Sequence, residues 1–519
     1  MSKRSGSVDE ENLAPLAKRS RMPDDIDENL LRMVEQHGQD DVLDASAVRR
    51  LILAFEKRSL KNQEMRIKFP DNPEKFMESE LELHTGLEEL HAIATVPELY
   101  PLVVNLNAVT SLLGLLTHEN SDIAIAVIDL IQELTDVDAL TESEEGAQEL
   151  IDTLVDGQVI ALLVQNLQRL DETIKEDSDG VHNALGVIEN MTEFRPELAK
   201  LATEQGLLAW ILQRLRATRG FDANKLYASE VLAILLQNEK ANRLCVGELN
   251  GIDALLQSVS YYKRRDPQSS EETELMENLF DCLCLSLMTK ENREKFLEGE
   301  GLQLMIIMLR EKKSSRNGAL KVLNHALTGV EGASNCNAFI EIGGLGSFFP
   351  HFMKTPKKSK KGLSESEYEE HVCAIVASLI KNATVANRTR LFQKFEENDC
   401  LKVERLMELN FKYSTKVRQV DDDNLDENRA AEEADELYLR KLDSGLFVLQ
   451  LVSYIIGEVC VQGPPSANQR VRTILNQKKM PIEDIKKILT EYAENVGDPE
   501  NEEERETEKN RILTLTAQL

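Results

Sequence analysis

The chain has 519 residues, a hydrophobic content of 42% and a formal net charge of −30. This composition allows a large buried core, and an aromatic content of only 5% indicates that aliphatic side chains fill it. The negative charge argues against a nucleic-acid backbone as the main ligand, because phosphate binding needs a basic face. It indicates either a basic partner or simply the means by which a long chain stays soluble.

Sequence motifs give no sign of catalysis, of a cofactor or of a metal. The phosphate-binding glycine loop, the dinucleotide glycine motif, the nucleophile elbow and the H-E-x-x-H motif do not occur. The seven cysteines lack metal-ligand spacing, and Cys282 and Cys284 lie in an apolar run, so we expect buried, reduced thiols in an intracellular protein. The cluster between His84 and His91 is interpreted as a polar helix face. We therefore predict a non-enzymatic protein without cofactor or metal.

Residues 1–45 are predicted to form a disordered tail, because polar residues dominate and apolar periodicity is weak. Two basic clusters lie in this tail, namely Lys3 and Arg4, then Lys18, Arg19 and Arg21. Clusters of this kind on a flexible tail can lie in the groove of an import receptor, and their spacing is close to that of a bipartite signal. We predict a nuclear localisation signal here.

An N-terminal helical cap is predicted over residues 46–77, with an amphipathic helix that ends before Pro70. A solenoid is expected from residue 78 to residue 462. In its first part a turn near His118 separates two helices, and Asp122 is a suitable N-cap for the second helix.

A repeat of 43 to 50 residues dominates the middle of the chain. In each unit an apolar helix begins at a glycine, and these glycines are Gly157, Gly206, Gly251, Gly301 and Gly344. An asparagine precedes three of them by nine residues, at Asn242, Asn292 and Asn335. This period is typical of helical repeat proteins, and one short helix followed by two longer ones indicates armadillo repeats. We predict an all-α, right-handed superhelical solenoid of armadillo-type repeats with helical caps.

Polar segments interrupt the later repeats and are predicted to be solvated loops, at residues 261–272, 354–362 (basic) and 419–436 (an acidic insert). The longest apolar run, residues 445–461, contains several polar residues and is interpreted as a buried helix rather than a membrane span. Residues 463–519 are predicted to form a C-terminal helical cap with an acidic tail.

Third helices of armadillo repeats line a concave groove. Aligning the predicted third helices by their ends gives a candidate peptide groove formed by Asp129, Glu133, Asn190 and Asn382. The same alignment places Val322 and Ala326 at groove positions. The tryptophan array of importin-type grooves is absent, and the single Trp210 is expected in the core of a second helix. The four polar residues either bind a basic extended segment through charge or are ordinary polar groove residues.

Several long segments are specific enough to indicate a family. They include FPDNPEKFMESELEL (69–83), LVDGQVIALLVQNLQRLDE (154–172), DGVHNALGVIENMTEFRPE (179–197) and YLRKLDSGLFVLQ (438–450). In these segments the chain resembles the β-catenin-like protein 1 family of nuclear armadillo proteins. The resemblance covers most of the chain, but the N-terminal tail, the acidic insert and the final twenty residues diverge from the family pattern.

The resemblance implies a nuclear scaffold of the spliceosome that binds basic localisation-type segments of splicing factors and supports pre-mRNA splicing. The implied partners belong to a complex built around a U-box ubiquitin ligase and a Myb-like splicing factor, and the family is also associated with self-association. In vertebrates the implied partners include an antibody-diversifying cytidine deaminase. An importin-like transport adaptor is the alternative function. Neither nucleic acid nor a membrane is expected as a direct partner.

Overall fold

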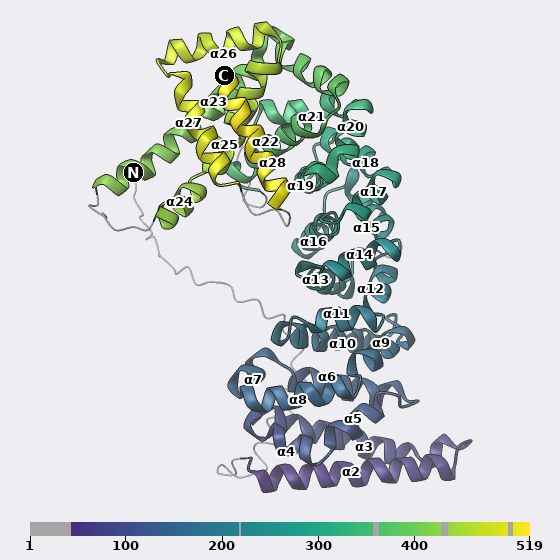
Figure 1. Ribbon diagram of the computed structural model, residues 1–519. Helices are drawn as coiled ribbons and strands as arrows, with labels where there is room; N and C mark the ends of the chain where they lie inside the picture. Colours follow the sequence, from purple (N-terminus) through teal and green to yellow (C-terminus); the bar gives the residue numbers. More distant parts are fainter. Residues whose placement is uncertain (1–42, 217–219, 357–362, 427–433, 497–501) are drawn as a thin grey trace, which may run out of the picture.

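The computed structural model describes residues 43–216, 220–356, 363–426, 434–496 and 502–519. All regular structure within these ranges is helical. Figure 1 shows the helices stacked into a curved solenoid that runs from α2 at one end to a denser C-terminal block at the other. The predicted all-α solenoid is therefore confirmed. The predicted localisation residues Lys3, Arg4, Lys18, Arg19 and Arg21 lie outside the described residues.

Two antiparallel helices form the N-terminal end. Helix α2 (Ala45–Lys68) begins at Asp44, whose side chain accepts a hydrogen bond of 2.7 Å from the backbone N–H of Ala47. The helix ends at Lys68, and its C-cap Phe69 lies directly before the proline expected to stop it. Helix α3 (Met77–Leu90) packs along α2, and a bidentate pair joins Arg58 to Glu89.

Each of the six following repeats contains a first, a second and a third helix. The first helices are α4 (Tyr100–Asn105), α8 (Glu144–Asp156), α11 (Leu198–Glu204), α14 (Lys240–Glu248), α17 (Lys290–Glu298) and α20 (Ala333–Glu341). The second helices are α5 (Ala108–Leu115), α9 (Val159–Arg169), α12 (Leu207–Arg216), α15 (Gly251–Ser260), α18 (Gly301–Arg310) and α21 (Gly344–Met353). The third helices are α6 (Ser121–Leu134), α10 (Lys175–Phe194), α13 (Ala223–Gln237), α16 (Ser270–Ser286), α19 (Ser315–Leu327) and α22 (Glu365–Asn382).

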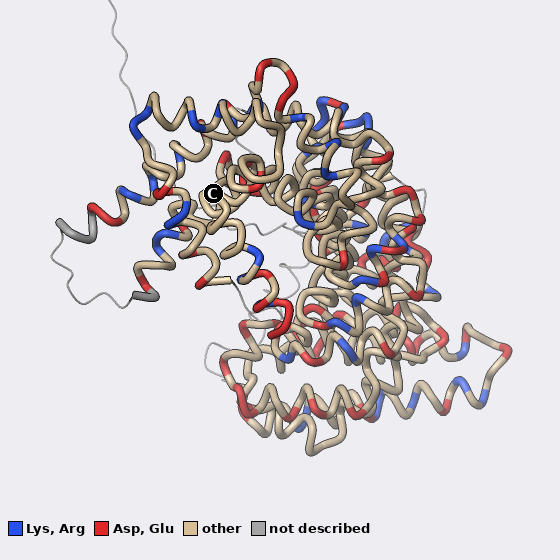
Figure 2. The backbone as a smooth tube through the Cα atoms, turned by 45° about the horizontal axis from the view of Figure 1, so that its top comes forward, with Lys and Arg blue, Asp and Glu red and all other residues tan. Residues whose placement is uncertain are grey.

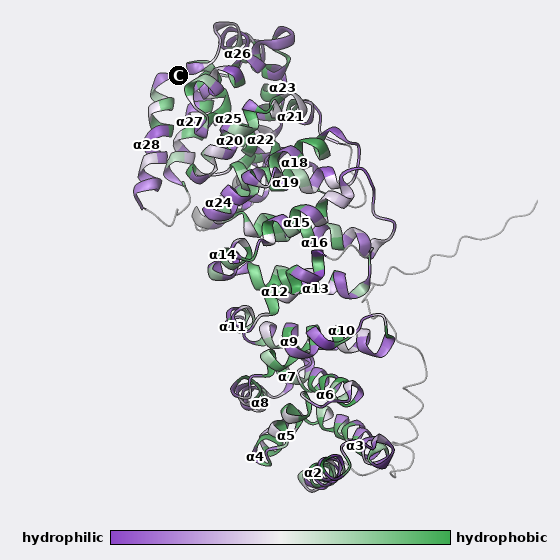
Figure 3. Ribbon diagram, turned by 90° about the vertical axis from the view of Figure 1, so that its right-hand side faces the viewer, coloured by the Kyte–Doolittle hydropathy of each residue, from purple (hydrophilic) through white to green (hydrophobic). Residues whose placement is uncertain are grey.

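Short elements complete the repeats. They are α7 (Val137–Glu142) and the 3-10 turns η1 (Pro73–Lys75), η2 (His91–Thr95), η3 (Pro97–Leu99), η4 (Tyr261–Lys263) and η5 (Val330–Gly332). Consecutive third helices pack side by side, so one aliphatic core runs through the whole stack. Figure 3 shows hydrophobic residues concentrated in helices such as α12, α15 and α25 (Leu446–Gln462). Each repeat is thus stabilised mainly by its neighbours.

Most of the repeated glycines allow close packing, and Gly206 also allows a left-handed backbone angle. Helices α15, α18 and α21 begin at their glycines as predicted, whereas α9 and α12 begin one or two residues later. At Gly251, Gly301 and Gly344 the left-handed residue is the one before the glycine, for example Glu300 with φ 58°, whereas Gly206 is itself left-handed with φ 97°. A Cβ atom on Gly301 would lie 2.3 Å from the ring of Phe296. A side chain at that position would therefore displace a fully buried aromatic ring.

The repeated asparagines join one repeat to the next. Asn292 is fully buried, and its amide nitrogen donates to the carbonyls of Arg243 (2.7 Å) and Ser286 (2.9 Å). Asn242 and Asn335 make equivalent pairs of hydrogen bonds in their own repeats. Each amide thus satisfies one carbonyl at the end of a third helix and one in the preceding first helix.

The C-terminal block departs from the repeat plan. It contains α23 (Val385–Asp426), α24 (Ala434–Asp443), α25, α26 (Pro465–Lys478), α27 (Ile482–Glu494) and α28 (Glu502–Gln518). Helix α23 is broken at Glu397–Cys400, where the backbone leaves helical geometry. Helix α25 lies in the centre, surrounded by α22, α23, α26, α27 and α28. Within the described ranges no single helix has the length and hydropathy of a membrane span, although three bent helix pairs reach these values together.

Three local expectations from the sequence are wrong. Asn120, not Asp122, caps α6, and its side chain accepts a hydrogen bond from the N–H of Asp122. The acidic insert is not a loop in its first part, because α23 continues as helix to Asp426. Trp210 is only half-buried, because its indole N–H reaches the carbonyl of Leu167 (3.0 Å) at the edge of the core.

Candidate functional site

The third helices form the inner surface of the solenoid. Figure 1 shows α10, α13, α16 and α19 on the inner side of the curve, in an unbroken series that continues into α22. Because each third helix packs directly on the next, one row of polar side chains runs across several repeats. This row is the surface on which the candidate peptide groove was predicted.

Asp129 and Glu133 lie one turn apart on α6 and share His91 from the end of α3. The distance from His91 Nδ1 to Glu133 Oε2 is 2.7 Å, and that from His91 Nε2 to Asp129 Oδ2 is 3.9 Å. Asn183 of α10 donates to Asp129 Oδ1 at 2.7 Å. Both carboxylates remain about half exposed. They can therefore still bind a cationic group from solvent.

The environment of His91 favours its charged form. Burial alone would lower the pKa of His91, but the hydrogen bond to Glu133 and the charges of Glu133 and Asp129 raise it. Burial also raises the pKa of Asp129, and the nearby Glu133 adds to this effect. Protonated His91 thus neutralises part of the negative charge at this end of the surface.

Asn190 lies on α10 and follows Glu189, which lines a pocket that sequence reasoning missed. Its amide nitrogen is 3.5 Å from the carbonyl oxygen of Gln132 on α6. The pocket has a volume of about 430 Å³ and opens between the C-terminal ends of α10 and α13. Its lining residues are Glu189, Thr192, Glu193, Pro196, Glu197, Ala199, Ile234, Gln237, Asn238 and Glu239.

Four glutamates give this pocket a negative character. Glu189 and Glu193 lie in the C-terminal part of α10, where backbone carbonyls also point outward, whereas Glu197 directly precedes α11 and Glu239 directly precedes α14. Tyr227 of α13 donates to Glu189, and the N–H of Ala241 donates to Glu239, which leaves Glu193 and Glu197 for a ligand. The pocket is large enough for the end of a lysine or arginine side chain. The sequence signal was present, as a Glu-rich segment at a predicted helix end, but the sequence could not show that it faces α13.

Asn382 lies apart from the other three predicted groove residues. It is the last residue of α22, and its amide nitrogen donates to the carbonyls of Leu327 (3.2 Å) and Gly329 (2.7 Å). The preceding Lys381 pairs with Glu508 of α28, which packs on the C-terminal block. The structure therefore brings Asp129, Glu133 and Asn190 to one region and gives Asn382 a role in joining repeats.

The sequence alignment of third helices was wrong for α19. Val322 and Ala326, which it placed in the groove, are fully buried. The polar positions of α19 are instead Lys321 and Asn324, which contact the neighbouring third helices. Helix ends vary by a residue or two between repeats, and a shift of one residue turns a side chain by about 100°. Alignment by helix ends therefore fails where the end differs.

Acidic side chains prevail along the row of third helices. The accessible ones include Asp129, Glu133, Glu189, Glu193, Glu277, Asp281, Glu367 and Glu370. Basic groups lie among these acidic side chains, and Lys321 of α19 pairs with Asp281 of α16 at 3.0 Å. His371 of α22 adds no positive charge to the row, because burial lowers its pKa to about 4 and it is neutral at physiological pH. Figure 2 shows acidic residues distributed over the length of the solenoid.

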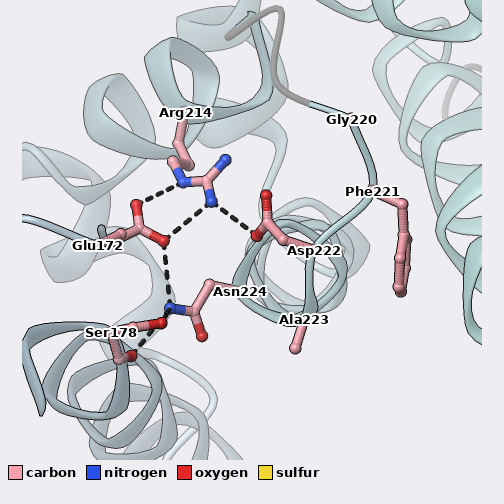
Figure 4. A pocket seen from close by; sticks show the side chains of 8 residues that line it. All are labelled: Glu172, Ser178, Arg214, Gly220, Phe221, Asp222, Ala223 and Asn224. Carbon is pink, nitrogen blue, oxygen red and sulfur yellow. Dashed lines mark hydrogen bonds and ion pairs between the residues drawn. The ribbon is translucent and has the colours of Figure 1, made fainter. Parts of the chain in front are cut away.

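A second pocket, of about 250 Å³, is closed by its own ion pairs (Figure 4). Arg214 of α12 donates to Glu172 through Nε (2.6 Å) and to Asp222 through Nη2 (2.7 Å). Asn224 of α13 donates to Glu172 (3.1 Å) and to the carbonyl of Ser178 (2.9 Å). Burial lowers the pKa of Arg214, but both carboxylates more than compensate and raise it. This network joins two repeats and leaves little capacity for a ligand.

The described residues contain no cluster of three or more His, Cys, Asp or Glu side chains that could hold a metal ion. All seven cysteines are free, and six of them are buried. Burial raises the pKa of the Cys282 and Cys284 thiols well above the ordinary value, which makes them poor nucleophiles.

Three-helix units whose third helices line the inner face define an armadillo-repeat protein. A sequence profile described as "Catenin-beta-like, Arm-motif containing nuclear" matches residues 28–490. The chain belongs to this catenin-beta-like family.

Individual relatives agree with this assignment. Beta-catenin-like protein 1 of Homo sapiens is 58% identical over 483 residues, which cover 91% of this chain and 86% of that protein. Its homolog in Schizosaccharomyces pombe is 34% identical over 478 residues, which cover 91% and 83%.

Solved structures give more distant matches. A designed armadillo repeat protein for modular peptide recognition matches 52% of this chain and 98% of its own length, with a TM-score of 0.37 and 16% identity. A chain from a study of the interaction between cadherin and beta-catenin matches 93% of each chain, with a TM-score of 0.43 and 14% identity.

Proposed function

We propose that this protein is a non-enzymatic nuclear scaffold that binds basic, extended segments of splicing factors and thereby supports pre-mRNA splicing. The observation that carries the proposal is the acidic surface of α6, α10 and α13, which combines accessible carboxylates with a pocket of suitable size. A disordered basic segment loses conformational entropy when it binds, and charge pairing along several repeats offsets this loss. The family, described as nuclear, supports the location.

The contacts of the surface suggest how a segment would bind. One lysine or arginine enters the glutamate pocket between α10 and α13, and a second pairs with Asp129 and Glu133 on α6. Neighbouring third helices lie about 10 Å apart, which an extended chain spans in about three residues. The proposed ligand therefore carries basic residues at intervals of about three to six positions.

Binding of a fluorescent lysine- and arginine-rich peptide to the purified chain tests the proposal. We expect affinity to fall steeply between about 50 mM and about 300 mM salt, because screening weakens exposed charge pairs. Glu133→Lys and Glu193→Lys should each weaken binding by about five- to tenfold, because each adds a repelling charge. Glu298→Lys, on the exposed end of the first helix α17, is the matched control. Equal effects of all three substitutions would contradict the proposed surface.

A transport adaptor has no specific support in the third helices. Importin-type grooves hold lysine stems between tryptophans, and the one tryptophan of this sequence lies on the second helix α12. Deletion of residues 1–21 separates the two functions in cells. A scaffold should lose only its own nuclear entry, whereas an adaptor should also lose the entry of its cargo.

A further inference from the structure

The outer face of α2, at the open end of the solenoid, carries an apolar stripe. Leu53, Leu60 and Ile67 are exposed to 65%, 58% and 74% of their surface. They are seven residues apart, so they form one line along the helix. The terminal helix of a solenoid normally presents a polar outer face, because no further repeat covers it. Three large aliphatic side chains in this line therefore indicate a covering partner.

Positive charge follows the stripe on one side. Arg50, Lys57, Lys61 and Lys68 are exposed and lie beside the stripe by helical periodicity, with Glu64 among them. Lys61 also pairs with Glu82 of α3 at 2.5 Å. The best complement to this face is an amphipathic helix with an apolar row and acidic flanks.

A segment of this chemistry lies just ahead of α2 in the same chain. Residues 26–37 read IDENLLRMVEQH, with Ile26, Leu30 and Met33 at helical spacing. Residues 24–37 contain five acidic residues and a single arginine. The family profile begins at residue 28, so most of this segment belongs to the part of the sequence that the family shares.

The connection is long enough for this segment to reach the stripe. Six residues, 38–43, separate it from Asp44, and six extended residues span about 20 Å. A helix of twelve residues is about 18 Å long, whereas Leu53 and Leu60 are about 10 Å apart along α2. The short tether also gives the segment a local concentration on the order of millimolar. We propose that residues 26–37 form a helix that docks antiparallel on α2 and covers Leu53 and Leu60.

This contact would order residues 26–37 within the tail (residues 1–45) that the sequence predicts to be disordered. It completes the N-terminal cap of the solenoid, and it sets the acidic side of the segment against Arg50 and Lys57. It also places the basic cluster that ends at Arg21 only four residues from the docked helix. The cluster is thereby held at the open end of the molecule, accessible to an import receptor.

Hydrogen–deuterium exchange of the full chain tests the contact. Amides of residues 28–37 should exchange about tenfold or more slowly compared with the isolated peptide 24–39. The protection should disappear in the double variant Leu53→Glu/Leu60→Glu and in Leu30→Glu/Met33→Glu. Lys57→Glu should reduce it. Val385→Glu, at another highly exposed aliphatic residue, is the control and should leave protection unchanged.

The outcomes separate the possible occupants of the stripe. Leu53 and Leu60 are outside the core, so their substitution should leave the melting temperature of the solenoid nearly unchanged. Unprotected amides in the unmodified chain, or protection that survives Leu53→Glu/Leu60→Glu, would overturn the contact. Protection that appears only with rising concentration, together with dimers in sedimentation velocity, would assign the stripe to a second copy and also overturn it. None of these results depends on peptide binding by the acidic surface.

Discussion

Buried asparagines set the spacing between repeats at the residue scale. Asn292 satisfies carbonyls in two neighbouring elements, and its Oδ1 atom occupies the space above Gly247, where a Cβ atom would lie only 2.1 Å away. The sequence revealed the recurrence of these asparagines but not their purpose. A hydrogen bond to a distant carbonyl has no local signature, so the pattern alone was compatible with either surface or core.

Asn292→Ala should therefore destabilise the central repeats. Loss of the amide leaves the carbonyls of Arg243 and Ser286 buried without this donor, which costs about 1 to 3 kcal/mol. Thermal unfolding followed by circular dichroism measures the change. Asn495→Ala removes an exposed asparagine of the C-terminal block and serves as the control. Equal stability of both variants would show that the hydrogen bonds of the buried asparagines contribute little to the stability of the fold.

His91 should make the N-terminal repeats sensitive to pH. Its pKa in the folded chain is raised, so the contact with Glu133 stabilises the fold fully below the unfolded pKa of about 6.5. This stabilisation is lost as the pH rises through the folded pKa. Urea unfolding at about pH 5.5 and about pH 8.5 should therefore show a larger loss for His91→Gln at the lower pH. A loss independent of pH would assign His91 a packing role only.

The broken helix α23 illustrates the element scale. Its second half packs against α22 around Glu369, which is buried to 97%. Glu369 accepts hydrogen bonds from Tyr413 (2.8 Å), Lys412 (2.7 Å) and Arg405 (3.0 Å). Burial would raise the pKa of Glu369, but the hydrogen bonds from Lys412, Thr355 and Tyr413 and the charge of Lys412 lower it. One buried carboxylate thus joins two elements that the repeat pattern does not pair.

Glu369→Ala should loosen the C-terminal block. Removal of this carboxylate leaves Arg405 and Lys412 without a buried counter-charge, which costs about 3 to 5 kcal/mol. Limited proteolysis within α23 and thermal unfolding should both report the change. Glu408→Ala is the control, because it removes an exposed partner of the same Arg405 and should cost about 1 kcal/mol or less. Similar losses in both variants would contradict the proposed role of burial.

The periodicity of the sequence predicted the positions of helices better than it predicted the contacts between them. The period of apolar residues located the third helices and the buried run at α25, because burial of one face imposes that period directly. It failed at the acidic insert, because α23 continues to Asp426 through residues that show little apolar periodicity. In the candidate groove, Asp129 and Glu133 could be predicted as a pair, since residues four apart share a helix face. The glutamate pocket could not, because it depends on how α10 and α13 meet.

At the scale of the whole molecule, the net charge determines how stability depends on salt. A charge of −30 repels itself in the compact state, and salt screens this repulsion. We expect the melting temperature to rise by roughly 1 °C between about 0.05 M and about 0.3 M sodium chloride, which corresponds to about 1 kcal/mol for a chain of this length. Sucrose at equal osmolality is the control for effects other than screening. Peptide affinity should fall over the same range of salt. The melting temperature and the peptide affinity therefore change in opposite directions, which separates an effect on stability from an effect on binding.

The two ends of the solenoid have different mechanical properties. The N-terminal repeats contact only their immediate neighbours, whereas α25 is enclosed on several sides by helices from across the C-terminal block. A pulling force applied between the ends should therefore unfold the N-terminal repeats first, one after another and at low force. The C-terminal block should unfold last, at higher force. The molecule therefore combines an extensible N-terminal part with a C-terminal block that keeps its shape under load.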